Sequence, residues 1–142
     1  MAATSYDAVS YPGYAYNQTH PDRLATQATL FGMAPAPPAA CRVLEIGAGD
    51  GGNLIPMALG LPGSEFVGID LSAEAVARGA AVIDELELPN VTLRVADVLE
   101  LPADLEPFDY VISHGVYSWI GPRPRDALVA ACGRLLTAHG VA

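Results

Sequence analysis

A glycine-rich turn follows a short apolar segment and carries the residues best suited to hold a cofactor. Residues 43–46 (Val-Leu-Glu-Ile) predict a buried parallel strand, and the turn at residues 47–52 follows without a break. Glycines in such a turn allow the backbone to approach a ligand closely. A helix predicted over residues 53–59 would direct its free N-terminal N–H groups toward that ligand. The pattern therefore indicates a site for a nucleotide-like cofactor, and Glu45 is costly to bury there without a role.

Acidic residues also end the next two predicted strands. Asp70 closes the strand predicted over residues 66–70, and Asp97 closes the strand predicted over residues 91–97. An acid in the position of Asp70 can accept hydrogen bonds from ribose hydroxyls. Either acid could instead cap the helix that follows its strand. Capping explains each acid singly, but it does not explain the ordered set of Glu45, Asp70 and Asp97.

Two cofactor classes are compatible with the glycine turn alone. Gly47-x-Gly49-x-x-Gly52 satisfies the dinucleotide fingerprint, which would make the protein an NAD-dependent oxidoreductase. A single match of this kind is weak evidence. A third hypothesis is a non-catalytic binding module that retains the pocket without the chemistry.

The wider context of the turn resembles the class I S-adenosylmethionine-dependent methyltransferases. Their first motif is an acid followed by alternating glycines, here Glu45-x-Gly47-x-Gly49-x-Gly51. In that family the second strand ends in a ribose-binding acid and the third in an acid that reads the adenine amino group, and the two acids described above match them. The resemblance implies S-adenosyl-L-methionine as the cofactor, and we expect NAD not to bind.

The resemblance also implies a set of cofactor-binding residues, and we expect no metal. These cofactor-binding residues lie in or just after the first three strands and at the end of the fourth: Glu45, Gly47, Ala48, Gly49, Asn53, Asp70, Leu71, Asp97, Val98 and Ser113.

The segment after the fourth predicted strand carries candidates for the reaction itself. Methyl transfer from a sulfonium is an in-line displacement, so the protein must align a nucleophile and exclude water. His114 could accept a proton from the nucleophile, and Tyr117 or Trp119 could form an aromatic wall for a cation. The alternative is that Trp119 belongs to the core and His114 only hydrogen-bonds a loop.

Alternating strands and helices must position these residues. A helix beginning at Ser72, a strand over residues 108–113 and a helix over residues 124–137 continue the pattern. This alternation predicts an α/β fold with a parallel sheet and helices on both faces. The resemblance implies a Rossmann-like sheet of order 3-2-1-4, with the ligand at the carboxyl ends of strands one and four.

The sequence ends where the family continues into a fifth strand. We therefore expect a domain truncated before that strand, with strand four left as an exposed apolar edge. Such an edge predicts self-association through strand four.

Residues 1–40 predict a separate N-terminal part before the methyltransferase-like residues 41–142. It contains tyrosines including Tyr6 and Tyr11, a helix capped by Thr19 and running to about Phe31, and a proline-rich connector over residues 34–38. This part could close over the cofactor as a lid or simply pack as a helix through Leu24, Ala28 and Phe31.

Residues 18–25 and 51–58 resemble one particular group within this family. They are similar to bacterial methyltransferases that carry a downstream methyltransferase regulatory domain, some of which methylate protein lysines. The resemblance therefore implies a protein as one candidate substrate.

Composition limits the partners of the chain. Its 142 residues carry a net charge of −9 and no lysine, so the surface repels phosphate backbones and we expect no nucleic-acid partner. No apolar run reaches membrane-spanning length, and the first residues lack a signal-peptide pattern. We expect a cytoplasmic protein without a membrane partner.

Overall fold

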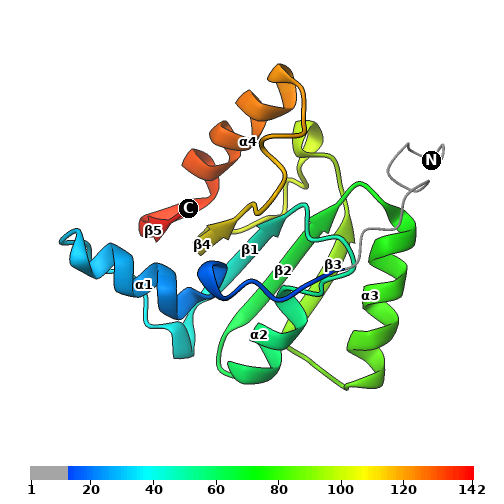
Figure 1. Cartoon of the computed structure of the whole chain (residues 1–142), viewed down its shortest axis with the longest axis horizontal. Coiled ribbons are helices and arrows are strands. Elements are labelled where there is room, and N and C mark those ends of the chain that lie inside the picture. Colours follow the sequence, from blue (N-terminus) through cyan, green and yellow to red (C-terminus); the bar gives the residue numbers. More distant parts are fainter. Residues whose placement is uncertain (1–12) are drawn as a thin grey trace.

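The computed structural model describes residues 13–142, so Tyr6 and Tyr11 lie outside the described part. Five parallel strands form one sheet in the order β3-β2-β1-β4-β5 (Figure 1). The strands are β1 (Arg42–Ile46), β2 (Glu65–Asp70), β3 (Val91–Val95), β4 (Phe108–Ile112) and β5 (Leu136–Val141). The predicted Rossmann-like α/β fold and the order of the first four strands are confirmed.

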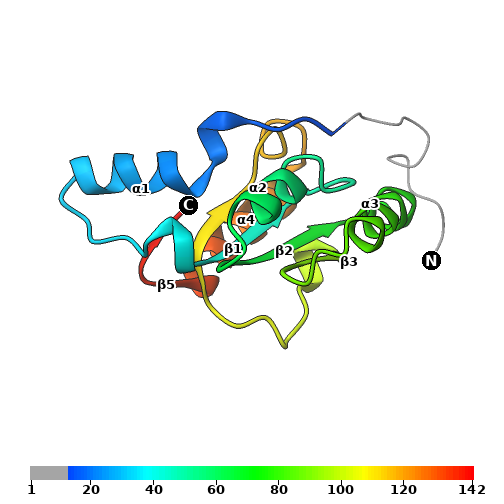
Figure 2. The ribbon, with the colours of Figure 1, turned by 90° about the horizontal axis from the view of Figure 1, so that it is seen from below.

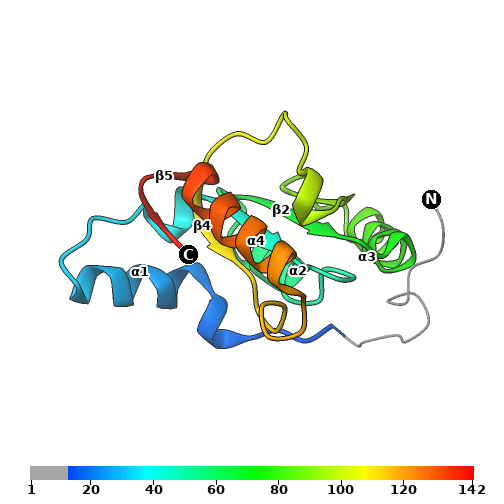
Figure 3. The same cartoon turned by 90° about the horizontal axis from the view of Figure 1, so that it is seen from above.

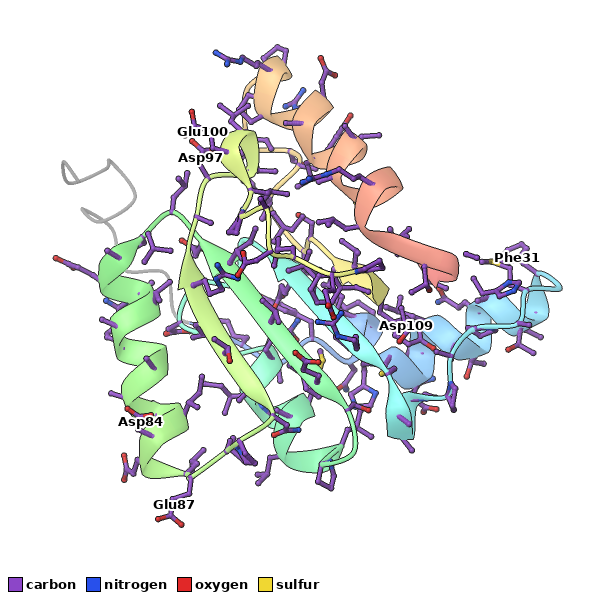
Figure 4. The ribbon with its side chains drawn as sticks, turned by 180° about the vertical axis from the view of Figure 1, so that it is seen from behind. Phe31, Asp84, Glu87, Asp97, Glu100 and Asp109 are labelled. Carbon is purple, nitrogen blue, oxygen red and sulfur yellow. The ribbon has the colours of Figure 1, made fainter. Side chains whose placement is uncertain are left out.

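The expected truncation before the fifth strand is wrong. Residues 136–141 pair with β4, with Phe108 opposite Leu136, Tyr110 opposite Val141 and an irregular register between them. The side chain of Asp109 on β4 (Figure 4) bonds both neighbouring strands: it accepts the Thr137 hydroxyl of β5 at 3.2 Å and the backbone N–H of Arg42 of β1 at 2.9 Å. Because β4 has a partner on both sides, it is not an exposed edge, and the reason for predicting self-association through it disappears.

Four helices cover both faces of the sheet, as predicted (Figures 2 and 3). They are α1 (Pro21–Leu30), α2 (Leu54–Gly60), α3 (Ala73–Glu85) and α4 (Pro122–Leu135). Successive strand residues point to opposite faces, so the sheet has two cores. On one face Val43, Phe66 and Tyr110 pack with α2 and Ile83; on the other, Leu44 and Phe108 pack with α4.

The starts of the helices agree with the sequence-based predictions in some cases and differ in others. Helix α3 begins directly after Ser72, close to the predicted start, and Ser72 caps it: its hydroxyl accepts the Ala75 N–H at 3.2 Å. Helix α1 is capped by His20 rather than Thr19: the His20 Nδ1 accepts the Asp22 N–H at 3.2 Å. Helix α4 begins two residues earlier than predicted because Pro122 occupies its first turn, where a proline lacks no needed N–H.

The far end of α1 does not pack as the sequence suggested. Phe31 is 88% exposed and lies at the tip of α1 (Figure 4), whereas Ala28 is buried. The connector after α1 is held to the sheet by the Tyr110 hydroxyl, which donates to the carbonyl of Ala36. None of the helices in the described part combines the length and the apolar character needed to cross a bilayer.

Candidate active site

The glycine-rich turn lies between β1 and α2 and adopts backbone conformations that require glycine. Gly47 and Gly49 have φ values of 82° and 57°, in the left-handed region. A Cβ at Gly47 would collide with the side chain of Val116, from the segment after β4. A Cβ at Gly49 would meet nothing within 4 Å. Gly49 therefore faces open space at the carboxyl end of β1, where a ligand could approach the backbone.

Asp70 connects this turn to the end of β2. One carboxylate oxygen accepts the Gly49 N–H at 2.8 Å, and the other accepts the Ser72 N–H at 2.8 Å. Asp70 is therefore not the cap of α3, a role that Ser72 has; its side chain instead holds the glycine turn to the start of the segment that leads into α3. Each carboxylate oxygen has a second lone pair, so these two bonds leave Asp70 able to accept further donors.

Asp97 lies beyond the end of β3, which stops at Val95 rather than at Asp97 as predicted. Its carboxylate accepts the Leu99 N–H at 2.8 Å and caps a short 3-10 helix, η3 (Val98–Glu100) (Figure 4). Val98 is half-buried and Leu71, after β2, is 40% exposed.

Glu45 is the buried carboxylate of the site, with 3% of its surface exposed. One oxygen, Oε1, accepts from the Asn53 amide at 2.8 Å. The other, Oε2, has no hydrogen-bond partner among residues 13–142. Burial raises the pKa of Glu45 to about 7, against the lowering effect of the Asn53 hydrogen bond and with a smaller raising effect of the Asp70 charge. A buried unpaired oxygen of this kind fits a site that a ligand completes.

Asn53 links Glu45 to the N-terminal segment. Its amide nitrogen donates to Glu45 and, at 3.0 Å, to the hydroxyl of Thr19. Its amide oxygen accepts the Tyr16 N–H at 2.9 Å. Thr19 and Tyr16 were not predicted as site residues; the buried position of Thr19 next to His20 gives no sequence signal, because it depends on this long-range contact.

His114 follows β4 and faces the same N-terminal segment. Its ring lies 3.9 Å from the ring of Tyr16, measured between centroids, and its Nε2 lies 3.2 Å from the Gln18 amide nitrogen. Beside it, the Ser113 hydroxyl donates to the carbonyl of Ile46 at 3.2 Å. An open cavity of about 140 Å³ has polar and apolar walls, formed by Gln18, Thr19, Leu24, Val111, Ile112, Ser113, His114 and Ala142.

The two aromatic candidates lie farther out. Trp119 is 82% exposed, so it is not the core residue that the alternative interpretation required. Tyr117 is half exposed, and the Arg125 guanidinium lies over its ring at 5.4 Å from the centroid. Arg125 also donates to the Tyr117 carbonyl at 2.8 Å. One face of the Tyr117 ring is therefore already occupied by a cation, while Val116 packs over the glycine turn.

A second open cavity, of about 390 Å³, lies at the amino ends of β1 and β2, away from all predicted site residues. Its charged walls are already paired, since Arg42 forms an ion pair with Glu65 at 2.9 Å. Within residues 13–142, no three His, Cys, Asp or Glu side chains are grouped as metal ligands.

Comparison with known proteins identifies relatives of the whole arrangement. Residues 43–140 match the protein family described as "Methyltransferase domain". PKMT2 from Rickettsia typhi, solved in complex with AdoHcy, superposes with a TM-score of 0.88 and 34% identity, over 92% of this chain and 25% of that one.

Two curated relatives support the match. An uncharacterised protein of Rickettsia prowazekii is 36% identical over 97% of this chain and 55% of its own length. Human EEF1A lysine methyltransferase 2 is 34% identical over 61% of this chain and 36% of its own length. The chain thus spans about half of the first relative and about a quarter of PKMT2.

Proposed function

Because this chain belongs to the class I S-adenosylmethionine-dependent methyltransferases, we propose that it holds this cofactor at the carboxyl ends of β1, β2 and β3 and takes part in methyl transfer to protein lysine. The observation that best supports this proposal is a hydrogen bond: the Asp70 carboxylate accepts the N–H of Gly49, and Gly49 lies in a turn that faces open space. The acid that we propose to bind the ribose and the turn that we propose to contact the rest of the cofactor therefore lie side by side.

Different residues of the chain would bind different parts of the cofactor. Asp70 would accept ribose hydroxyls, while Asp97, Val98 and Leu71 would border the adenine. Gly47, Ala48 and Gly49 would place backbone against the amino-acid end of the cofactor. Beneath this turn, the Oε2 atom of Glu45 has no hydrogen-bond partner among residues 13–142 and can accept a hydrogen bond. A cofactor that carries an ammonium group would supply the donor.

S-adenosylmethionine, when bound, supplies an electrophilic methyl group on a sulfonium. The protein's part is to orient the acceptor and remove its proton. His114 is the titratable side chain beside the 140 Å³ cavity, and we assign it the proton-accepting role, with Ser113 at the cofactor side. Tyr117 would shape the outer approach rather than contact the sulfonium, since Arg125 already covers one face of its ring.

Two observations favour a lysine of a protein as acceptor. The relative EEF1A lysine methyltransferase 2 is, by its name, an enzyme that methylates lysine. The chain also has a net charge of −9, which favours approach of a basic polypeptide.

A calorimetric titration with S-adenosylhomocysteine and, separately, with NADH tests the cofactor assignment. We expect binding of the first and none of the second, because the family and its solved relatives use the methyl donor. Binding of NADH alone would overturn the proposal in favour of an oxidoreductase. Binding of S-adenosylhomocysteine without methyl transfer to lysine-bearing proteins would favour a non-catalytic binding module.

A further inference from the structure

Asn53 lies at the start of α2, where an asparagine side chain normally caps the helix. It is the N-cap residue of α2, and asparagine at an N-cap usually accepts a hydrogen bond from the first turn. Here the side chain makes no capping bond. It is 4% exposed and directs all of its polar atoms to other parts of the chain.

The hydrogen bonds around Asn53 allow only one orientation of its amide. The Tyr16 N–H can only donate, so it must face the amide oxygen, at 2.9 Å. The Glu45 carboxylate, when ionised, can only accept, so it must face the amide nitrogen, at 2.8 Å. The second amide hydrogen reaches the Thr19 hydroxyl at 3.0 Å, and that hydroxyl donates onward to the Tyr16 carbonyl at 2.9 Å. Both amide hydrogens and the amide oxygen are thus used.

Residues 13–20 touch the site at two further places. Gly13 passes so close to the glycine turn that a Cβ there would collide with Asp50 and lie 3.0 Å from the Cα of Gly52. At the other end, Tyr16 stacks on His114. The segment therefore runs across the mouth of the site, over α2 and the glycine turn, as Figure 2 shows for the stretch before α1.

We propose that Asn53 is a positioning residue that latches residues 13–20 over the cofactor pocket, so that closure of this segment and cofactor binding stabilise each other. The proposal rests on the cofactor role given above. One amide joins Glu45, on the floor of the pocket, to Tyr16 and Thr19, in its cover. A ligand that engages Glu45 fixes Asn53, and a fixed Asn53 holds the segment closed; thermodynamic linkage then requires the reverse effect with the same factor.

The test combines two variants with one control. Asn53→Ala removes all three bonds, and Thr19→Val removes one hydroxyl at nearly constant volume while leaving Asn53 in place. Thr26→Val is the matched control, because among residues 13–142 the Thr26 hydroxyl bonds only the Asp22 carbonyl, at 2.7 Å, on the exposed surface of α1. Each protein is titrated with S-adenosylhomocysteine by calorimetry, and exchange of the Tyr16 amide hydrogen is followed by NMR with and without the ligand.

We expect Asn53→Ala and Thr19→Val to weaken S-adenosylhomocysteine binding about fivefold or more, with no change for Thr26→Val. In the unaltered protein the ligand should slow exchange of the Tyr16 amide, and in Asn53→Ala this slowing should disappear. If Asn53→Ala fails to fold, Thr19→Val carries both measurements.

Two outcomes would contradict the proposal, and they can be told apart. If S-adenosylhomocysteine binds the unaltered protein but neither Thr19→Val affinity nor Tyr16 exchange responds, the latch is refuted and the cofactor role stands. If the ligand does not bind the unaltered protein at all, the cofactor role fails, and the linkage fails with it.

Discussion

The buried Glu45 should make the stability of this protein depend on pH in a direction opposite to that of most carboxylates. Burial raises its pKa from the ordinary 4.5 to about 7. Below pH 4.5 the side chain is protonated in both the folded and the unfolded chain and costs nothing. Between pH 4.5 and about 7 the unfolded chain has released the proton while the folded chain keeps it, so the free energy of unfolding falls as the pH rises. Above about pH 7 the full cost is present.

The size of this cost follows from the two pKa values. Their difference, multiplied by about 1.4 kcal/mol per pH unit, gives about 3 kcal/mol. Glu45 is only 3% exposed, so solvent screening does little to reduce it. The change that isolates this effect is Glu45→Gln, which keeps the shape and an oxygen for the Asn53 amide but cannot ionise.

Urea unfolding of both proteins at several values from about pH 5 to about pH 8 measures the effect. Relative to Glu45→Gln, the unaltered protein should lose about 3 kcal/mol of unfolding free energy across this range. Other titrating groups cancel in the difference between the two curves. Glu85→Gln, on the exposed surface of α3, is the control and should follow the unaltered protein. Parallel curves for Glu45→Gln and the unaltered protein would refute the argument from burial.

Three substitutions test the cofactor pocket and the reaction. Gly49→Val should abolish S-adenosylhomocysteine binding in a protein still folded by circular dichroism, whereas Gly32→Val, with a similar positive φ and equally open space, should retain it. Asp70→Ala should cost about 1–3 kcal/mol of cofactor binding in calorimetry, and Asp84→Ala on the far end of α3 (Figure 4) should cost nothing; equal affinities would remove Asp70 from the site. His114→Gln keeps a partner for Gln18 but no titratable nitrogen, so methyl transfer at saturating cofactor should fall about 100-fold; undiminished turnover would exclude His114 as the base.

The sequence predicted the parts of the fold that are encoded locally. The apolar segments around Val43 and Phe108 are buried strands because their residues suit both faces of a covered sheet. The start of α3 near Ser72 is also predictable, because it depends on a local bond between residues three positions apart.

The missed features depend on distant contacts. Residues 136–141 include Thr-Ala-His-Gly, which resemble a turn, yet pairing with β4 and the Thr137–Asp109 bond make them a strand. Thr19 was read as a helix cap, but its hydroxyl turns inward to Asn53, far along the chain. Asn53 was predicted to bind the cofactor, and nothing local to it reveals that its amide is committed to Glu45 and the N-terminal segment.

The strand order also bears on how the protein is synthesised. Strands β1 to β3 are consecutive in the chain and can pair as soon as they leave the ribosome, whereas β4 joins the other side of β1 only after residue 108. Until then β1, the most buried strand of the finished sheet, has one unpaired edge and exposes Val43 and Leu44. Until β4 is made, the nascent sheet therefore keeps an apolar edge that can pair with another chain, and this edge closes only when residues 108–112 pair with β1.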